Sequence, residues 1–167
     1  MSVAAAMATP PAIAEAYVVD ASVGIKLYVE EELSDAPHAL FALLKHERPV
    51  RLVVPDLFYI ECTNILWKYH QRFGLSRADA EVAVDQLGQL LLHSTPTAAL
   101  TADALSLAMT HGITAYDAAY VALAQRLAIP LVTADAALMR KLAGAPFDLR
   151  WLGAWSPPAA AGQVDLQ

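Results

Sequence analysis

Cysteine is nearly absent from this sequence of 167 residues, which contains only Cys62. A single thiol cannot form an internal disulfide, and it cannot build a zinc site from several cysteines. The five histidines are too scattered to form a ligand pair of the His-x-x-x-His kind, so a zinc centre is not expected. A lone cysteine is typical of a reducing compartment, and we therefore predict a cytoplasmic protein.

Long apolar runs are lacking as well. The longest uncharged stretch in the middle of the chain, residues 86–102, contains glutamine, histidine, serine and proline, whereas a membrane span needs about 20 predominantly apolar residues. The alanine-rich N-terminus has no basic residue before Lys26, although a secretory signal places positive charge ahead of its apolar stretch. We therefore expect neither a membrane protein nor a secreted one.

Basic residues are fewer than acidic ones: 11 Lys and Arg oppose 17 Asp and Glu, and the formal net charge is −6. This balance argues against a protein that grips nucleic acid broadly through its charge. It does not exclude an enzyme that acts on nucleic acid, because carboxylates that bind divalent cations add negative formal charge and then change sign locally. The positions of the acids are therefore more informative than their number.

Apolar side chains, in contrast, are abundant: they make up 57% of the residues, against 17% charged. This composition excludes disorder of the whole chain, and the length suits one domain. We expect the folded domain to span residues 15–153. Residues 1–14 and 154–167 are rich in alanine and proline, and we expect them to be loose extensions.

Short apolar runs alternate with longer helical patterns. Four runs of four or five residues predict buried strands at residues 16–19, 51–54, 129–133 and 149–152. Capping residues and terminal glycines predict helices at residues 57–73, 76–93, 97–111 and 114–128. This alternation predicts an α/β fold of three layers (α/β/α), in which a central parallel sheet is covered by helices on both faces.

Two acids stand at the ends of predicted strands: Asp20 follows the first apolar run and Asp135 follows the third. In an open parallel sheet, ligands bind beyond the carboxyl ends of the strands, and an acid there projects into the crevice. Each of these acids can also be the N-cap of the helix that follows. Their position alone leaves both interpretations open.

Two further acids lie within predicted helices. Glu61 stands among apolar neighbours, where burial is costly unless the carboxylate is paired or bound to a metal. Asn64 follows it on the same side of the helix. Asp117 lies in the first turn of its helix and forms a capping box with Thr114. The competing interpretations are a Glu61 that faces solvent and an Asp117 that only caps its helix.

The four acids are more informative together than singly, because each follows a strand at one edge of the predicted sheet or lies near the start of a helix that begins at that edge. Carboxylates brought together repel one another and tend to stay protonated unless a cation compensates. Oxygen ligands select hard cations, and such a site suits the hydrolysis of a phosphodiester bond. We therefore predict a site for Mg²⁺ (or Mn²⁺) formed by Asp20, Glu61, Asp117 and Asp135.

Four segments, in this order, resemble the PIN-domain ribonucleases, and more narrowly the VapC toxins of bacterial and archaeal toxin–antitoxin pairs. The segments are Val18-Val19-Asp20-Ala21-Ser22, Glu61-Cys62-Thr63-Asn64-Ile65-Leu66, residues 114–124 and residues 131–138. The resemblance covers about residues 17–152. Any one of these motifs alone is weak, whereas four in the right order are specific.

The resemblance implies a function and a set of site residues. It implies a PIN-like fold and a metal-dependent endoribonuclease that arrests growth, is usually a homodimer, and is blocked by a cognate VapB-type antitoxin. The family's acidic quartet, which binds Mg²⁺ or Mn²⁺, is matched by Asp20, Glu61, Asp117 and Asp135. Its supporting polar positions, which orient the carboxylates, are matched by Ser22, Asn64 and Thr133. Two departures do not touch the quartet: Cys62-Thr63 replaces a more usual small apolar pair, and the N-terminal extension is longer than typical.

Two other functions compete with the nuclease. One is a catalytically silent PIN-like domain that serves as a binding module, and the presence of all four acids argues against it. The other is a receiver-like phosphoacceptor with Asp56 at a strand end. That function would need a lysine after a late strand, where this sequence has Thr133-Ala134-Asp135.

Overall fold

The computed structural model of the chain describes residues 15–29, 35–45 and 50–156. Its centre is a five-stranded sheet with the strand order β3-β2-β1-β4-β5. Each pair of neighbouring strands is parallel. The strands are β1 (Ala16–Val19), β2 (Arg51–Pro55), β3 (His93–Thr95), β4 (Leu131–Thr133) and β5 (Leu149–Trp151). The predicted α/β fold with a central parallel sheet is therefore confirmed.

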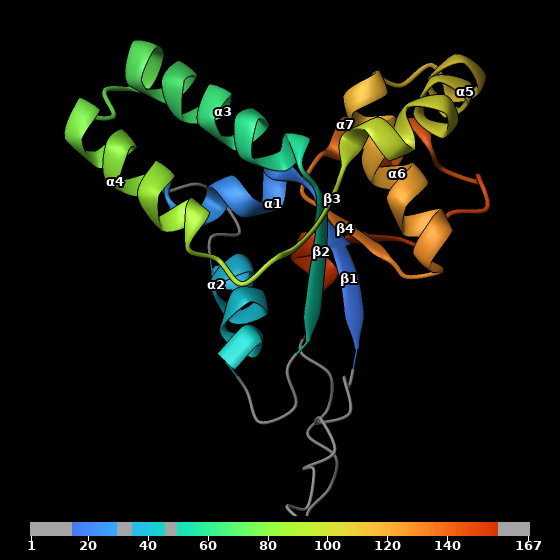
Figure 1. Ribbon diagram of the computed structural model, residues 1–167, viewed down its shortest axis with the longest axis horizontal. Helices are drawn as coiled ribbons and strands as arrows, with labels where there is room; N and C mark the ends of the chain where they lie inside the picture. Colours follow the sequence, from blue (N-terminus) through green and yellow to red (C-terminus); the bar gives the residue numbers. More distant parts are fainter. Residues whose placement is uncertain (1–14, 30–34, 46–49, 157–167) are drawn as a thin grey trace, which may run out of the picture.

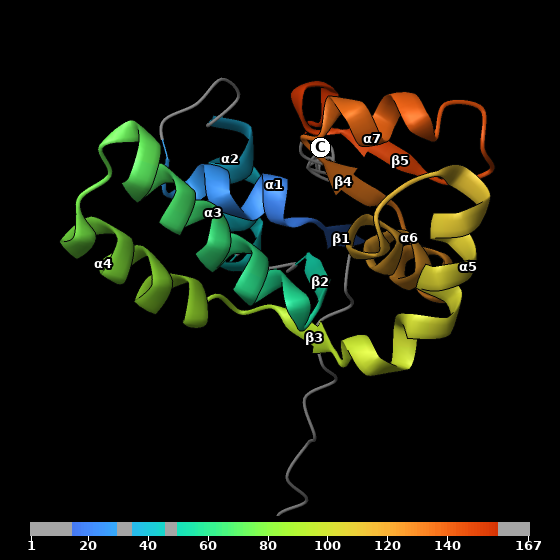
Figure 2. The same cartoon turned by 90° about the horizontal axis from the view of Figure 1, so that it is seen from above.

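Helices cover both faces of this sheet and give the fold three layers (Figure 1, Figure 2). One face is covered by α1 (Ala21–Gly24), α2 (Asp35–Ala42), α3 (Leu57–Phe73) and α4 (Arg77–Gly88). The other face is covered by α5 (Thr101–His111) and α6 (Ala115–Leu127). A last helix, α7 (Ala136–Lys141), follows β4 and contacts β5. Short 3-10 turns complete the connections: η1 (Ile25–Leu27), η2 (Leu43–Lys45), η3 (Thr97–Leu100) and η4 (Leu152–Ala154).

The core lies between the sheet and these helices. The central strands bury apolar side chains completely, among them Val18, Val19, Leu52, Val54, Leu131 and Val132. The helix α6 is buried at each residue from Ala118 to Ala124, and four of these seven residues are alanines. Small side chains allow a helix to approach its neighbours closely, so α6 is the central helix of its layer.

The contact between α1 and α3 leaves no room for a side chain on Gly24. A Cβ atom placed there would lie 2.4 Å from Cζ of Phe58, which is itself fully buried. Glycine is therefore required at this position for steric reasons. Through this contact α1, which follows Asp20, packs directly against α3, which carries Glu61.

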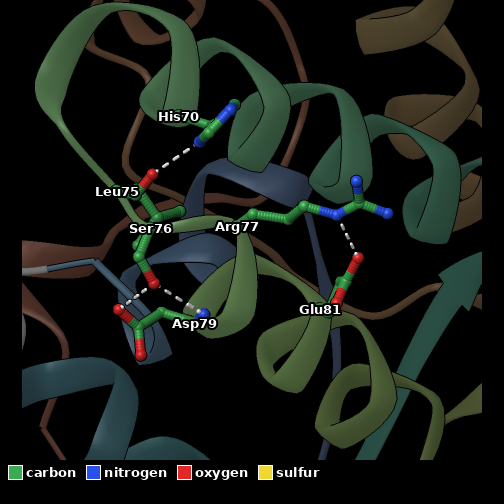
Figure 3. A network of polar contacts seen from close by, with 6 residues as sticks. All are labelled: His70, Leu75, Ser76, Arg77, Asp79 and Glu81. Carbon is green, nitrogen blue, oxygen red and sulfur yellow. Dashed lines mark hydrogen bonds and ion pairs between the residues drawn. The ribbon is translucent and has the colours of Figure 1, made fainter.

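A network of polar contacts forms the turn between α3 and α4 (Figure 3). α3 ends at Gly74 in the left-handed conformation (φ +79°), as a terminal glycine predicts. The Nδ1 atom of His70 lies 2.7 Å from the carbonyl oxygen of Leu75. Ser76 then caps α4: its Oγ accepts from the amide of Asp79 (3.0 Å) and donates to the carboxylate of Asp79 (2.6 Å). The predicted N-terminal cap of this helix at Ser76 is therefore confirmed.

Three parts of the fold differ from the sequence prediction. The predicted helix 76–93 is too long, because α4 ends at Gly88 and His93 begins β3. The leucines at 90–92 continue an apolar pattern beyond the true helix end. β3 is a three-residue edge strand, too short for an alternating pattern to reveal it. The helix α2 has no counterpart in the prediction either.

The ends of the predicted domain lie near the limits of the described residues. The predicted extension 1–14 lies outside them, as do residues 157–167 of the C-terminal extension. Trp155 packs edge-on against Tyr17 with 6.3 Å between the ring centroids, so packing against the core continues past residue 153. No helix in the described part of the chain is long and apolar enough to cross a membrane.

Candidate active site

Asp20 follows β1 and is the N-cap of α1, which places it at the carboxyl edge of the sheet. It is 6% exposed, and its Oδ1 accepts hydrogen bonds from the Ser22 hydroxyl (2.5 Å) and the Val23 amide (3.2 Å). Burial raises the pKa of this carboxyl from 3.8 to about 6, although hydrogen bonds from Ser22, Thr133 and Val23 lower it. Asp20 is therefore both a helix cap and a buried acid, so its two interpretations are compatible.

A polar bridge joins the ends of β1 and β4, which are neighbours in the sheet. The Ser22 Oγ accepts from the amide of Ala134 (2.9 Å) and lies 3.5 Å from the Oγ1 of Thr133. Thr133 is fully buried, and its hydroxyl oxygen accepts from the amide of Asp135 (3.0 Å). Ser22 and Thr133 therefore hold the end of β4 next to Asp20.

Asp135 follows β4 and is the N-cap of α7. Its Oδ1 accepts from the amides of Ala137 (2.7 Å) and Leu138 (3.1 Å). The capping interpretation of this acid is therefore correct in the structure. The Asp135 backbone is also linked to the buried acid through two hydroxyls. The Thr133 hydroxyl accepts from the Asp135 amide and lies 3.5 Å from the Ser22 hydroxyl, which donates to Asp20.

Asp117 reaches the same region from the first turn of α6. Thr114 caps this helix: its Oγ1 accepts from the Asp117 amide (3.1 Å) and donates to the Asp117 carboxylate (2.7 Å). Burial is the main cause of the raised pKa of Asp20 and of Glu61, and the negative charge of Asp117 adds a smaller contribution to each. Asp117 therefore lies close enough to both of these acids for their charges to interact, in addition to its role in the cap.

Glu61 faces inward from the second turn of α3 and is half-buried. The Tyr120 hydroxyl donates to its Oε2 at 2.6 Å. Burial raises the pKa of Glu61, while the hydrogen bond from Tyr120 lowers it. Tyr120 is 2% exposed, and burial together with the charge of Glu61 raises the pKa of its hydroxyl far above the usual range. Glu61 is therefore neither fully buried nor simply solvent-facing, because its half-buried carboxylate accepts a hydrogen bond from a buried tyrosine.

The structure thus brings three of the predicted acids into one electrostatic group, while Asp135 adjoins it through Thr133. Among residues 15–29, 35–45 and 50–156, no set of three or more His, Cys, Asp or Glu side chains stands close enough to form a ready-made metal site. The available donors are carboxylate and hydroxyl oxygens, which suit Mg²⁺ or Mn²⁺ rather than zinc. The raised pKa values of Asp20 and Glu61 mark buried carboxylates that also lie near the charge of Asp117, and a cation would offset both costs.

Glu61 also lines an open hollow of about 790 Å³. The helix α3 supplies most of its wall, and Tyr116 of α6, the neighbour of Asp117, supplies the rest. Asn64 lies in this wall as an exposed side chain, outside the buried network. Trp67 and Tyr116 expose 57% and 63% of their surface, and Lys68 stands beside them. The hollow therefore combines aromatic faces, one cation and one of the clustered acids. The full lining is Ile60, Glu61, Thr63, Asn64, Ile65, Trp67, Lys68 and Tyr116.

The role of Tyr120 has no counterpart in the sequence prediction. The available signal is its spacing, because Tyr120 lies three residues after Asp117 and therefore on the same side of α6. The unusual Cys62 has a packing role: it is fully buried, and its thiol donates to the carbonyl of Ala21 at 3.9 Å. The departure from the family pattern at this position therefore lies in the contact between α1 and α3.

Comparison with known proteins gives matches over most of the chain. The PIN domain family matches residues 17–145. The chain is 40% identical to Ribonuclease VapC3 of Pyrobaculum aerophilum over 129 residues, which is 74% of this chain and 92% of that protein. The crystal structure of PAE2754 from Pyrobaculum aerophilum is similar with a TM-score of 0.58 and 26% identity, over 85% of this chain and 93% of that one. A toxin–antitoxin complex from Klebsiella pneumoniae shares the fold, with a TM-score of 0.55 and 17% identity, over 80% of this chain and 95% of that one.

Proposed function

Because this chain belongs to the PIN-domain family, and within it to the VapC ribonucleases, we propose that it is a metal-dependent endoribonuclease and the toxin of a toxin–antitoxin pair. The observation that carries the proposal is the group formed by Asp20, Glu61 and Asp117. These acids come from three segments near the carboxyl edge of one parallel sheet, and the charge of Asp117 contributes to the raised pKa values of both Asp20 and Glu61. Burying carboxylates costs stability, so a group of this kind favours a catalytic role over a structural one.

The proposed ion is Mg²⁺ or Mn²⁺, and its proposed ligands are Asp20, Glu61, Asp117 and Asp135. Asp20 and Asp135 engage their helix amides through Oδ1, and Asp117 engages Thr114 through Oδ2. Each of these carboxylates therefore has a second oxygen that can bind a cation. Ser22 and Thr133 are proposed to orient the carboxylates, and Asn64 is proposed as a further supporting group on the side of the hollow.

The proposed reaction is hydrolysis of an RNA phosphodiester bond. When bound, the ion supplies Lewis-acid activation of a water molecule and neutralises charge on the phosphate. The hollow beside Glu61 offers a path for the strand, because unpaired bases stack on exposed aromatic rings such as Trp67 and Tyr116. Lys68 can then contact a phosphate. These features favour a single-stranded segment of RNA as the substrate.

The proposal includes protein partners. The neighbour from Klebsiella pneumoniae is a toxin–antitoxin complex, and we propose a cognate VapB-type antitoxin for this chain as well. We also propose a homodimer, because several large apolar side chains on α3, α4 and α5 are exposed and suit protein contacts. They are Ile60, Phe73, Val82, Leu105 and Met109. The proposed location is the cytoplasm, where the lone Cys62 would remain reduced.

Cleavage of RNA by the purified protein tests the proposed site. Native protein with Mn²⁺ should cleave single-stranded RNA, EDTA should abolish cleavage, and excess Mn²⁺ or Mg²⁺ should restore it. Asp20→Asn should be inactive but folded, because it removes a charged ligand at constant shape. The matched control is Asp85→Asn, an exposed acid on α4 that should remain active. A folded Asp20→Asn protein with native activity, or cleavage that survives chelation, would contradict the site assignment.

Expression without a partner tests the toxin function in cells. The native chain should arrest growth, and Asp117→Asn should not, because Asp117 contributes charge to the acidic group. Coexpression of the antitoxin from a neighbouring gene should restore growth. If the native chain neither arrests growth nor cleaves RNA although it binds that partner, the catalytically silent binding module becomes the better interpretation.

A further inference from the structure

The hydroxyl of Tyr120 is placed to act on the site through Glu61. It donates to Oε2 of Glu61 at 2.6 Å, and this hydrogen bond joins α6 to α3 across 59 positions of the sequence. Tyr120 is 2% exposed, so a hydroxyl at this depth requires a partner within the protein. Glu61 provides that partner.

The same helix supplies a second proposed ligand. Asp117 and Tyr120 are three residues apart in α6, so both side chains lie on the face of the helix that is directed toward α3. The position of α6 thereby controls Asp117 directly and Glu61 through the Tyr120 hydroxyl. We infer that Tyr120 is a positioning residue that fixes the Glu61 carboxylate for the divalent cation. This inference rests on the proposed function.

The physical reason lies in the freedom of a glutamate side chain. Glu61 is only half-buried and borders an open hollow, so its carboxylate can rotate into solvent unless it is held. A hydrogen bond from a buried, rigid ring to Oε2 selects one orientation of the carboxylate, and Oε1 would remain available to a divalent cation. Groups that orient metal ligands in this way typically change metal affinity by roughly 10-fold to 100-fold when they are removed.

The test is a double-mutant cycle read out by direct Mn²⁺ binding. Mn²⁺ titrations, followed by calorimetry or by the electron paramagnetic resonance signal of free Mn²⁺, would be made on the native protein, Tyr120→Phe, Glu61→Ala and the double variant. Tyr120→Phe keeps the buried ring and removes only the hydroxyl. It should weaken Mn²⁺ binding by roughly 10-fold or more in the native background and by less than about 2-fold in the Glu61→Ala background. The matched control is Tyr69→Phe, which removes the hydroxyl of a tyrosine on α3. This variant should bind Mn²⁺ as the native protein does.

The possible results separate this inference from the proposed function. If the native protein binds Mn²⁺ and Tyr120→Phe binds it equally well, the positioning role is refuted and the proposed function is not affected. Equal weakening in both backgrounds would also refute it, because Tyr120 would then act through the fold in general. If the native protein binds no Mn²⁺, the proposed metal site itself fails, and this inference fails with it.

A measurement on the native protein covers the case in which Tyr120→Phe does not fold. With carbon-labelled tyrosine, the Cζ resonance of Tyr120 reports on its hydrogen bond. Saturation with Mg²⁺ should shift this resonance, because Glu61 would then share its charge between the hydroxyl and the ion, and the Cζ resonance of Tyr69 should not move. An unchanged Tyr120 resonance in a protein saturated with Mg²⁺ would overturn the inference.

Discussion

Replacing Asp20 by asparagine should stabilise the protein while abolishing its proposed activity. The carboxyl is 6% exposed, and its pKa is about 6 instead of 3.8, mainly because burial disfavours the charged form. At ~1.36 kcal/mol per pKa unit, the ionised carboxyl reduces the free energy of unfolding by up to about 3 kcal/mol. Asparagine has the same shape, and its carbonyl oxygen can still accept from the Ser22 hydroxyl and the Val23 amide. The substitution should therefore remove the unfavourable charge and keep the helix cap.

The stabilisation should depend on pH in one direction. The folded-state pKa of Asp20 lies above the unfolded value of 3.8, so at pH values well below 3.8 the carboxyl is neutral in both states and the charge costs nothing. As the pH rises through the window from 3.8 to about 6, the unfolded chain ionises first and the native protein loses stability. The advantage of Asp20→Asn should therefore grow through this window and level off above it.

Urea unfolding of the native and variant proteins between about pH 4 and about pH 8, in EDTA, measures this difference. Asp85→Asn removes the charge of an exposed acid on α4 and should show no comparable dependence on pH. An Asp20→Asn protein that is no more stable than the native protein at about pH 8, or whose advantage is equal at all pH values, would refute the argument from a buried charge.

Three further substitutions test how the fold supports the site. In the same urea assay, Gly24→Ala should lower the free energy of unfolding by about 1–3 kcal/mol, because a Cβ would lie 2.4 Å from a buried ring atom. The control Gly88→Ala has free space for a Cβ and should be neutral or slightly stabilising. Thr133→Val should shift the acid limb of the pH–rate profile to higher pH, because it removes a hydrogen bond that lowers the pKa of Asp20; an unshifted profile would contradict this role. Trp67→Ala should raise the KM for RNA by roughly 5-fold or more without changing Mn²⁺ affinity, while Phe73→Ala, exposed on the same helix outside the hollow, should leave KM unchanged.

The sequence predicts the fold well where local signals and burial agree. The helix predicted at 57–73 has these bounds in the structure, because Gly74 provides a left-handed end. The first strand is also found at 16–19. Short apolar runs predict four of the five strands, since buried parallel strands are apolar on both faces. Polar caps at Ser76 and Thr114 correctly predict where two helices begin.

The features that the prediction misses depend on contacts between distant segments. β3 is held at the edge of the sheet by pairing with β2, and nothing within its three residues specifies a strand. The Tyr120 hydroxyl has a role only because α3 brings Glu61 to it. The sequence suggests which acids form the proposed site, but it does not predict the environment of each one. Asp20 is buried, Asp117 interacts with two other acids, and Asp135 engages its helix amides.

The place where the acids meet follows from the order of the strands. The chain runs from β1 to β2 and β3 in one direction across the sheet, and from β4 to β5 in the other, so the direction reverses between β1 and β4. Ligands in open α/β sheets bind beyond the carboxyl ends of strands at such a point. Asp20 and Thr133 stand at the ends of these two strands, while α3 and α6 approach from opposite faces of the sheet with Glu61 and Asp117 (Figure 1). The charge that Asp20 holds at a cost in stability therefore lies at the topological position where such sheets bind ligands, and this location explains why the more stable asparagine variant should be the inactive one.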